Sequence, residues 1–100
     1  MKRSTILEQS DGPAKRFASL GEPARLAILE YLRRDTHCLC EMQDDLGMAP
    51  NLLSYHMRIL REAGLVSGRR NGRRVEYRIE RQGFEALCSE LEAFGGAGER

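Results

Sequence analysis

Apolar positions along most of the chain recur at the three- and four-residue spacing of an α-helix. The pattern predicts a short helix over residues 11–20, followed by a longer one opened by Glu22-Pro23 and running to about residue 34. The second helix carries the broader apolar face, because Leu26 and Leu29 widen the stripe. We therefore expect this helix at the centre of the core.

Two further helices follow, joined by the tight connection Gly47-Met48. The first is predicted over residues 38–46 and the second from Ala49-Pro50 to residue 63. The second leaves a polar face, which holds Asn51, Ser54, Tyr55, Arg58 and Arg61. Two short helices with this connection describe a helix-turn-helix over about residues 38–64.

The rest of the chain predicts a β-hairpin and a last helix. Runs at 65–70 and 73–79 flank Asn71-Gly72, a strong hairpin signal because both residues readily take positive φ. Residues 81–94 form a helix whose apolar stripe is Phe84, Leu87, Cys88, Leu91 and Phe94, a face suited to self-association. One hundred residues suffice for a single domain, mainly α with a β-hairpin wing.

The charge distribution adds to this picture. The net charge is only +1, but the basic residues are concentrated in one segment. Residues 58–81 hold eight basic and three acidic side chains. Such a stripe beside a helix-turn-helix predicts double-stranded DNA as partner. Base edges and phosphates would be contacted by Asn51, Ser54, Tyr55 and Arg58 in the major groove, and by Arg70, Arg73 and Arg74 of the wing along the backbone or minor groove.

Taken singly, each feature has an ordinary alternative. The arginines are compatible with a solvated hairpin, and the polar helix face with the wet side of an amphipathic helix. A winged helix that binds another protein is a further possibility. The combination of a helix-turn-helix with an adjoining basic hairpin favours DNA.

The expected cellular compartment indicates what chemistry the cysteines can have. The chain has no apolar run of signal-peptide or membrane-span length, so we expect a cytoplasmic protein and no membrane partner. In that reducing compartment Cys38 and Cys40, two residues apart, suggest metal or redox chemistry rather than a structural disulfide. An enzyme is disfavoured, because neighbouring residues such as His37 and Cys38 rarely face each other productively.

Two segments resemble the ArsR/SmtB family of metal-responsive repressors: residues 17–26 (FASLGEPARL) and residues 54–66 (SYHMRILREAGLV). The resemblance covers about residues 14–80. It implies a homodimeric winged helix-turn-helix that leaves its operator when an inducer binds, with no cofactor required for DNA binding. It also suggests a structural or phosphate-contacting place for His56. Ala49 departs from the family, which usually has a capping Ser there.

The segment from Cys38 to Met42 resembles the Cys-Val-Cys-Asp-Leu box of the arsenic-responsive and cadmium/lead-responsive branches. Gln43 stands where the arsenic box often has a third cysteine, and residues 1–37 lack the additional cysteines of the cadmium branch. Two thiols favour As(III), Sb(III) or a methylated trivalent arsenical as inducer. Cadmium, lead or zinc, and oxidants or persulfides, remain alternatives.

Details of the thiol site stay open at this stage. A third ligand would come from His37, Cys88 or solvent, although Cys88 lies on the apolar stripe that is expected to bury against another subunit. Residues two apart on a regular helix point about 200° away from each other. We therefore expect one ion to be held by Cys38 and Cys40 only if the first helical turn is extended or unwinds, and capture of an ion would disturb the helix-turn-helix and lower DNA affinity.

Overall fold

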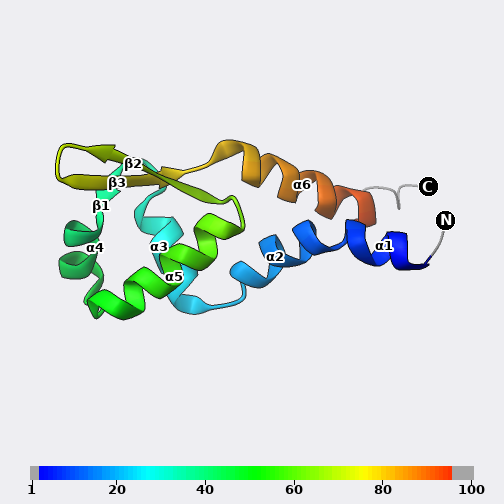
Figure 1. Cartoon of the computed structure of the whole chain (residues 1–100), viewed down its shortest axis with the longest axis horizontal. Coiled ribbons are helices and arrows are strands. Elements are labelled where there is room, and N and C mark those ends of the chain that lie inside the picture. Colours follow the sequence, from blue (N-terminus) through cyan, green and yellow to red (C-terminus); the bar gives the residue numbers. More distant parts are fainter. Residues whose placement is uncertain (1–2, 96–100) are drawn as a thin grey trace.

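The computed structural model describes residues 3–95 of the chain, which fold into a helical body with a small sheet along one side (Figure 1). The elements are α1 (Arg3–Gln9), α2 (Asp11–Ser19), α3 (Pro23–Tyr31), β1 (His37–Cys38), α4 (Leu39–Leu46), α5 (Pro50–Glu62), β2 (Val66–Asn71), β3 (Arg74–Ile79) and α6 (Arg81–Gly95). The arrangement of α4, α5 and the β2–β3 hairpin is that of a winged helix-turn-helix, as predicted.

The core lies where α3, α4 and α5 meet the base of the sheet. The predicted central helix, α3, contributes Ile28, which is fully buried. Residues from each of the surrounding elements complete the cluster, including Met42, Leu53, Leu60 and Leu65. Helix α5 and the base of the wing are therefore anchored in one continuous apolar core.

The sheet has three antiparallel strands in the order β1-β3-β2. The wing's register pairs Asn71 with Arg74, so the two central turn residues are Gly72 and Arg73. Gly72 has φ 68°, whereas Asn71 does not adopt positive φ. The predicted hairpin is confirmed, but the central turn residues are Gly72 and Arg73 rather than Asn71 and Gly72. The difference arises because a two-residue turn can place glycine at its first central position.

Two short elements were not predicted. β1 pairs His37 with Tyr77 and Cys38 with Glu76, and α3 ends at Tyr31, three residues before the expected end. The chain must leave the helix there to reach the edge of β3. Helix α1 precedes α2, and its residues 6–9 are exposed.

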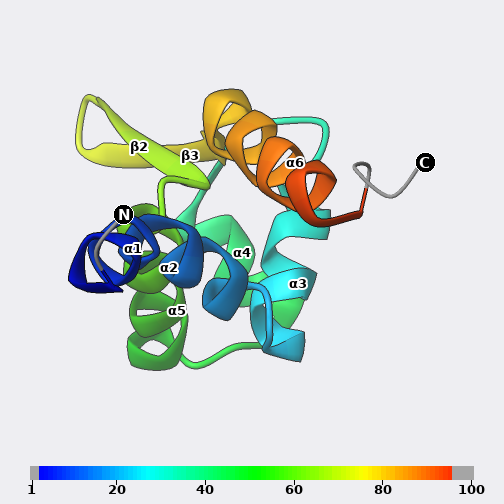
Figure 2. The same cartoon turned by 90° about the vertical axis from the view of Figure 1, so that its right-hand side faces the viewer.

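Helices α2 and α6 lie side by side and extend away from the wing (Figures 1 and 2). An ion pair between Arg16 and Glu90 joins them. At this end the exposed large apolar side chains of α1 and α6 are Ile6, Leu7, Leu91 and Phe94. None of the helices in the described part of the chain is long and apolar enough to cross a membrane.

Cys88 also lies on α6 and is exposed. Within one chain the apolar stripe of α6 is therefore left uncovered at Cys88. The reason is that only the first half of α6 covers the body, where Leu87 is buried, while the second half leaves it. Burial of Cys88 against a second subunit stays a prediction.

The Tyr31 hydroxyl on α3 donates a hydrogen bond to the Asp45 carboxylate on α4. That bond, followed by desolvation, raises the pKa of Tyr31 to about 12 from an ordinary 10.0. The contact therefore stabilises the fold below pH 10 and is lost as pH rises through about 12. Absorbance titration should place Tyr31 near its ordinary pKa in Asp45→Asn but not in Asp44→Asn. An unchanged Tyr31 titration in Asp45→Asn would contradict the contact.

Candidate nucleic-acid interface and cysteine site

Helix α5 begins with the unusual pair Ala49 and Pro50. Ala49 is the N-cap and supplies no side-chain hydrogen bond, as its chemistry predicts, and Pro50 needs no partner for a backbone N–H. The Asn51 Oδ1 atom accepts a hydrogen bond from the Leu52 backbone N–H at 3.0 Å. Asn51 therefore satisfies a first-turn donor that the absent capping serine leaves free.

The opposite faces of α5 divide as predicted. Its buried side holds Leu53, His56, Met57 and Leu60. Asn51, Ser54, Tyr55 and Arg58 are all exposed, and with Arg61 they line a hollow of about 440 Å³ whose other walls come from Leu39, Met57 and Tyr77. The Arg58 guanidinium carbon lies 5.9 Å from the centre of the Tyr55 ring, a cation–π contact that helps to orient it.

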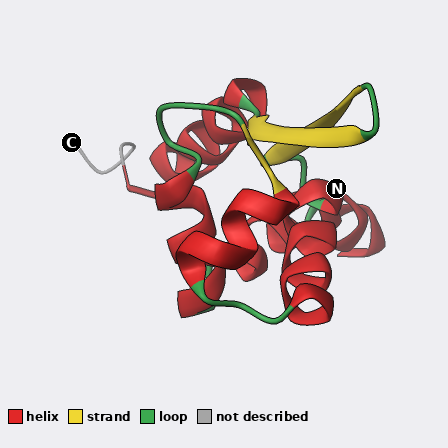
Figure 3. Ribbon diagram, turned by 90° about the vertical axis from the view of Figure 1, so that its left-hand side faces the viewer, coloured by secondary structure: helices red, strands yellow, loops and turns green. Residues whose placement is uncertain are grey.

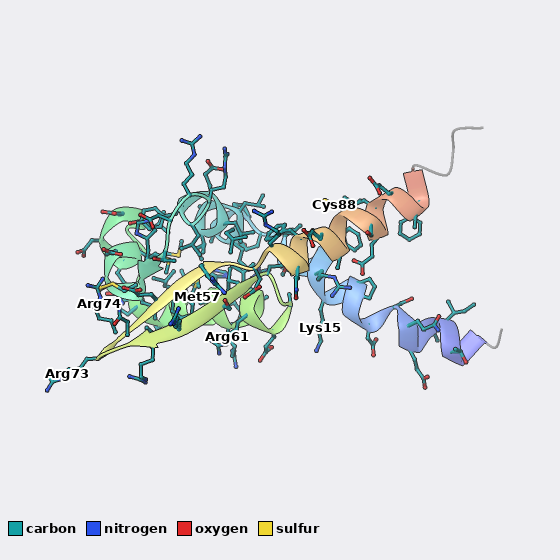
Figure 4. All side chains as sticks on the ribbon, turned by 90° about the horizontal axis from the view of Figure 1, so that it is seen from above. Lys15, Met57, Arg61, Arg73, Arg74 and Cys88 are labelled. Carbon is teal, nitrogen blue, oxygen red and sulfur yellow. A yellow bond between two sulfur atoms is a disulfide. The ribbon has the colours of Figure 1, made fainter. Side chains whose placement is uncertain are left out.

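The wing projects beyond the helical body (Figure 3). Arg70, Arg73 and Arg74 are exposed, as predicted for phosphate contacts. Figure 4 separates two of them: Arg73 lies at the tip and points outward, whereas Arg74 is turned toward the body. The polar face of α5 and this basic hairpin form the surface that the charge distribution predicts, a protruding helix beside a cationic ribbon.

His56 is 6% exposed and belongs to the interior of the helix-turn-helix. Its Nδ1 atom is 3.0 Å from Arg25 Nη1, and Arg25 Nε donates to the Ser19 backbone carbonyl at 2.7 Å. These contacts join α2, α3 and α5. The structural place suggested for His56 is therefore confirmed, while the role of Arg25 as its partner was not predicted.

Cys38 stands at a junction: it is the last residue of β1 and the N-cap of α4. Its backbone is extended, with φ −86° and ψ 165°, and its sulfur is bonded to that of Cys40, with 5.3 Å between the two Cα atoms. Both sulfurs thus converge while α4 stays intact from Leu39. The expected condition, a first turn that is extended or unwinds, is met in its extended form, because Cys38 precedes the helix with an extended backbone.

The capping arrangement at α4 is reciprocal. Cys38 Sγ accepts a hydrogen bond from the Glu41 backbone N–H at 3.4 Å, and Glu41 Oε1 accepts one from the Cys38 N–H at 3.1 Å. That backbone bond, then the contact with His37 and the charge of Arg74, lower the pKa of the Glu41 carboxyl. Glutamate three residues after a cap was the sequence signal for this role, with cysteine in place of serine or threonine.

The two cysteines differ in access: Cys38 is 3% exposed, whereas Cys40 is exposed. Arg74 Nη2 donates to Cys38 Sγ at 3.1 Å and lies 3.6 Å from Glu41 Oε2. An incoming ligand therefore meets Cys40 first, and Cys38 lies beneath a guanidinium from the wing.

The candidates for a third ligand are placed less favourably. His37 Nδ1 is 3.1 Å from Glu41 Oε1, and its ring centre is 4.3 Å from that of Tyr31. Cys88 lies on α6, at the other end of the molecule from Arg74 (Figure 4). Within residues 3–95 no cluster of three or more His, Cys, Asp or Glu side chains is arranged to hold a metal ion. Of the predicted ligands, the structure brings together only the sulfurs of Cys38 and Cys40.

A winged helix-turn-helix with a polar recognition helix and a basic wing defines a DNA-binding regulator. Residues 22–67 match the model of the bacterial regulatory protein family arsR. The chain is 36% identical over 89 residues to the HTH-type transcriptional repressor SmtB of Mycobacterium tuberculosis, covering 89% of this chain and 64% of that protein. It is 30% identical to the HTH-type transcriptional regulator Rv2034 of the same species, covering 82% and 77%. The chain belongs to the arsR family.

Solved structures agree with this assignment. An ArsR-like transcriptional regulator from Rhodococcus sp. RHA1 superposes with a TM-score of 0.82 at 24% identity, covering 90% of this chain and 85% of that one, a likeness of fold. A possible transcriptional regulator for arsenical resistance gives a TM-score of 0.72 at 28% identity, covering 80% and 83%. The chain spans about three fifths of the length of the SmtB repressor.

Proposed function

We propose that this protein is a homodimeric transcriptional repressor that leaves its operator when a trivalent arsenical or antimonial binds Cys38 and Cys40. The observation that carries the proposal is the convergence of both sulfurs at the first residues of α4, within the helix-turn-helix. The wing and α5 supply the DNA surface. The exposed apolar side chains of α1 and α6 suit the contact between subunits.

The chemistry of two adjacent thiols fits these ligands. A thiol reductant gives two electrons and two protons to the Cys38–Cys40 disulfide, yielding two thiols, and is itself oxidised to a disulfide. Methylarsenous acid then forms two S–As bonds and releases two waters, keeping its methyl group. Arsenous acid does the same and keeps one hydroxyl. Thiolates select such soft centres, whereas structural zinc sites generally have four ligands.

A thiol-oxidation sensor of the same fold is the second candidate, favoured by the bond between the two sulfurs. Hydrogen peroxide would accept two electrons from the thiol pair, giving the disulfide and two waters, and an organic hydroperoxide would give the disulfide, one water and one alcohol. The same residues would then respond to oxidants or polysulfides rather than to metalloids.

The inducer class is tested on the reduced protein with a duplex selected from random DNA. We expect salt-sensitive, sequence-selective binding that arsenite, antimonite and methylarsenite weaken by roughly 5- to 150-fold, measured by fluorescence anisotropy. Cadmium, lead, zinc, peroxide and polysulfide serve as parallel additions. Release by cadmium, lead or zinc without arsenite would contradict the ligand assignment. Release by peroxide or polysulfide alone would favour the oxidation sensor, and failure to select any duplex would refute DNA binding.

A further inference from the structure

Arg74, the first residue of β3, connects three parts of the molecule. Its guanidinium Nη2 is 3.1 Å from Cys38 Sγ and 3.6 Å from Glu41 Oε2. Cys38 is the N-cap of α4 and Glu41 lies in the first turn of that helix. One side chain of the wing thus contacts both the cysteine pair and the start of the helix-turn-helix.

The backbone reinforces the same connection. Cys38 pairs with Glu76 of β3, two residues along the strand from Arg74. The short strand that holds the inner cysteine therefore belongs to the same sheet as the wing. A change at Cys38 reaches the wing through a side-chain contact and through strand pairing, without passing through α5.

Arg73, the residue before Arg74, points in a different direction. Arg73 points outward at the tip, whereas Arg74 is turned toward the body (Figure 4). The Arg74 side chain is nevertheless 52% exposed, so it remains accessible to a DNA phosphate. Arg74 is therefore placed to contact DNA and the cysteine pair from one position.

We propose that Arg74 is the positioning residue that couples inducer capture to DNA release, an inference that rests on the proposed function. In the structure Cys38 Sγ, which is bonded to Cys40 Sγ, and Glu41 hold the Arg74 guanidinium at the base of the wing. In the proposal the same two contacts hold it in the reduced, inducer-free protein. An arsenical forms one bond to each sulfur and introduces atoms beside Cys38, in space that Arg74 covers. The hydrogen bond to sulfur is then lost, the wing is no longer held, and DNA affinity falls.

Arg74→Gln tests this coupling, with Arg73→Gln as the matched control. Operator affinity is measured by anisotropy with and without arsenite on the reduced protein, and arsenic bound per chain is measured separately. For wild type the ratio of the two affinities is expected to be roughly 5 to 150. Arg73→Gln should weaken both states alike and keep that ratio. Arg74→Gln should bind arsenite normally, yet bring the ratio close to unity.

Glu41→Gln removes the charge that faces Arg74 while keeping a side chain able to complete the cap. It should also lower the ratio without loss of arsenite binding. A wild-type ratio in Arg74→Gln would overturn the inference, as would loss of arsenite binding in that variant. A wild-type ratio in Glu41→Gln would refute the part assigned to Glu41. If wild type itself fails to bind arsenite or to release DNA, the proposed function fails instead.

Discussion

Gly83→Ala is expected to destabilise the protein by about 3 kcal/mol or more. A Cβ atom at this position in α6 would lie 2.0 Å from the Gly64 carbonyl oxygen and 2.9 Å from its carbonyl carbon. Both are backbone atoms, held between the end of α5 and β2, so neither moves away as a flexible side chain would. Relief requires α6 to shift from the body, which would loosen the burial of Leu87.

Gly12→Ala is the matched control, because Gly12 also lies in the first turn of a helix. Its added Cβ atom would approach only the flexible end of Arg16, at 3.7 Å. The higher helix propensity of alanine should stabilise that variant by up to about 1 kcal/mol. Urea unfolding of both variants measures the change in the free energy of unfolding that each substitution causes. Equal effects of the two substitutions would contradict the close approach of α6 to Gly64.

Asn51→Asp is expected to weaken operator binding by about 1–3 kcal/mol or more. The aspartate still offers an oxygen to the Leu52 N–H and is favoured near a helix N-terminus, so the fold should be kept. It loses the amide donor that would face a base edge and places a negative charge toward DNA. Preference for one base in the site should relax as affinity falls.

Arg73→Gln should behave differently, because a phosphate contact carries no sequence information. Its affinity should fall alike for all duplexes, and the salt dependence should weaken by about one charge. Binding isotherms over a salt series, on the selected duplex and its single-base variants, separate the two behaviours. Uniform weakening by Asn51→Asp with unchanged base preference would remove Asn51 from base readout.

Much of this fold could be predicted because its signals are local. Pro50 at the start of α5 and Gly72 in the wing turn mark their elements through backbone chemistry that does not depend on the rest of the chain. The exposed residues of the candidate DNA surface follow from helical periodicity in the same way. Once the hairpin was predicted, its arginines were also predicted to lie close together.

The unpredicted features depend on tertiary contacts. A strand of two residues at His37–Cys38 has no pattern of its own and forms because β3 offers an edge. That strand sets the extended backbone of Cys38, and so brings its sulfur to Cys40 without cost to α4. The contact of Arg74 with Cys38 spans 36 positions of the chain. Neither feature is visible in local spacing, which predicted only that the first turn of the helix must be extended or unwind.

The most direct test of the central claim compares operator affinity with and without arsenite for reduced wild type, Cys38→Ser and Cys40→Ser. The account predicts normal operator binding by all three proteins and release only of wild type. Cys88→Ser, altered on distant α6, should still respond. Serine variants of Cys38 and Cys40 that release DNA as wild type does would contradict control of this winged helix by its cysteine pair.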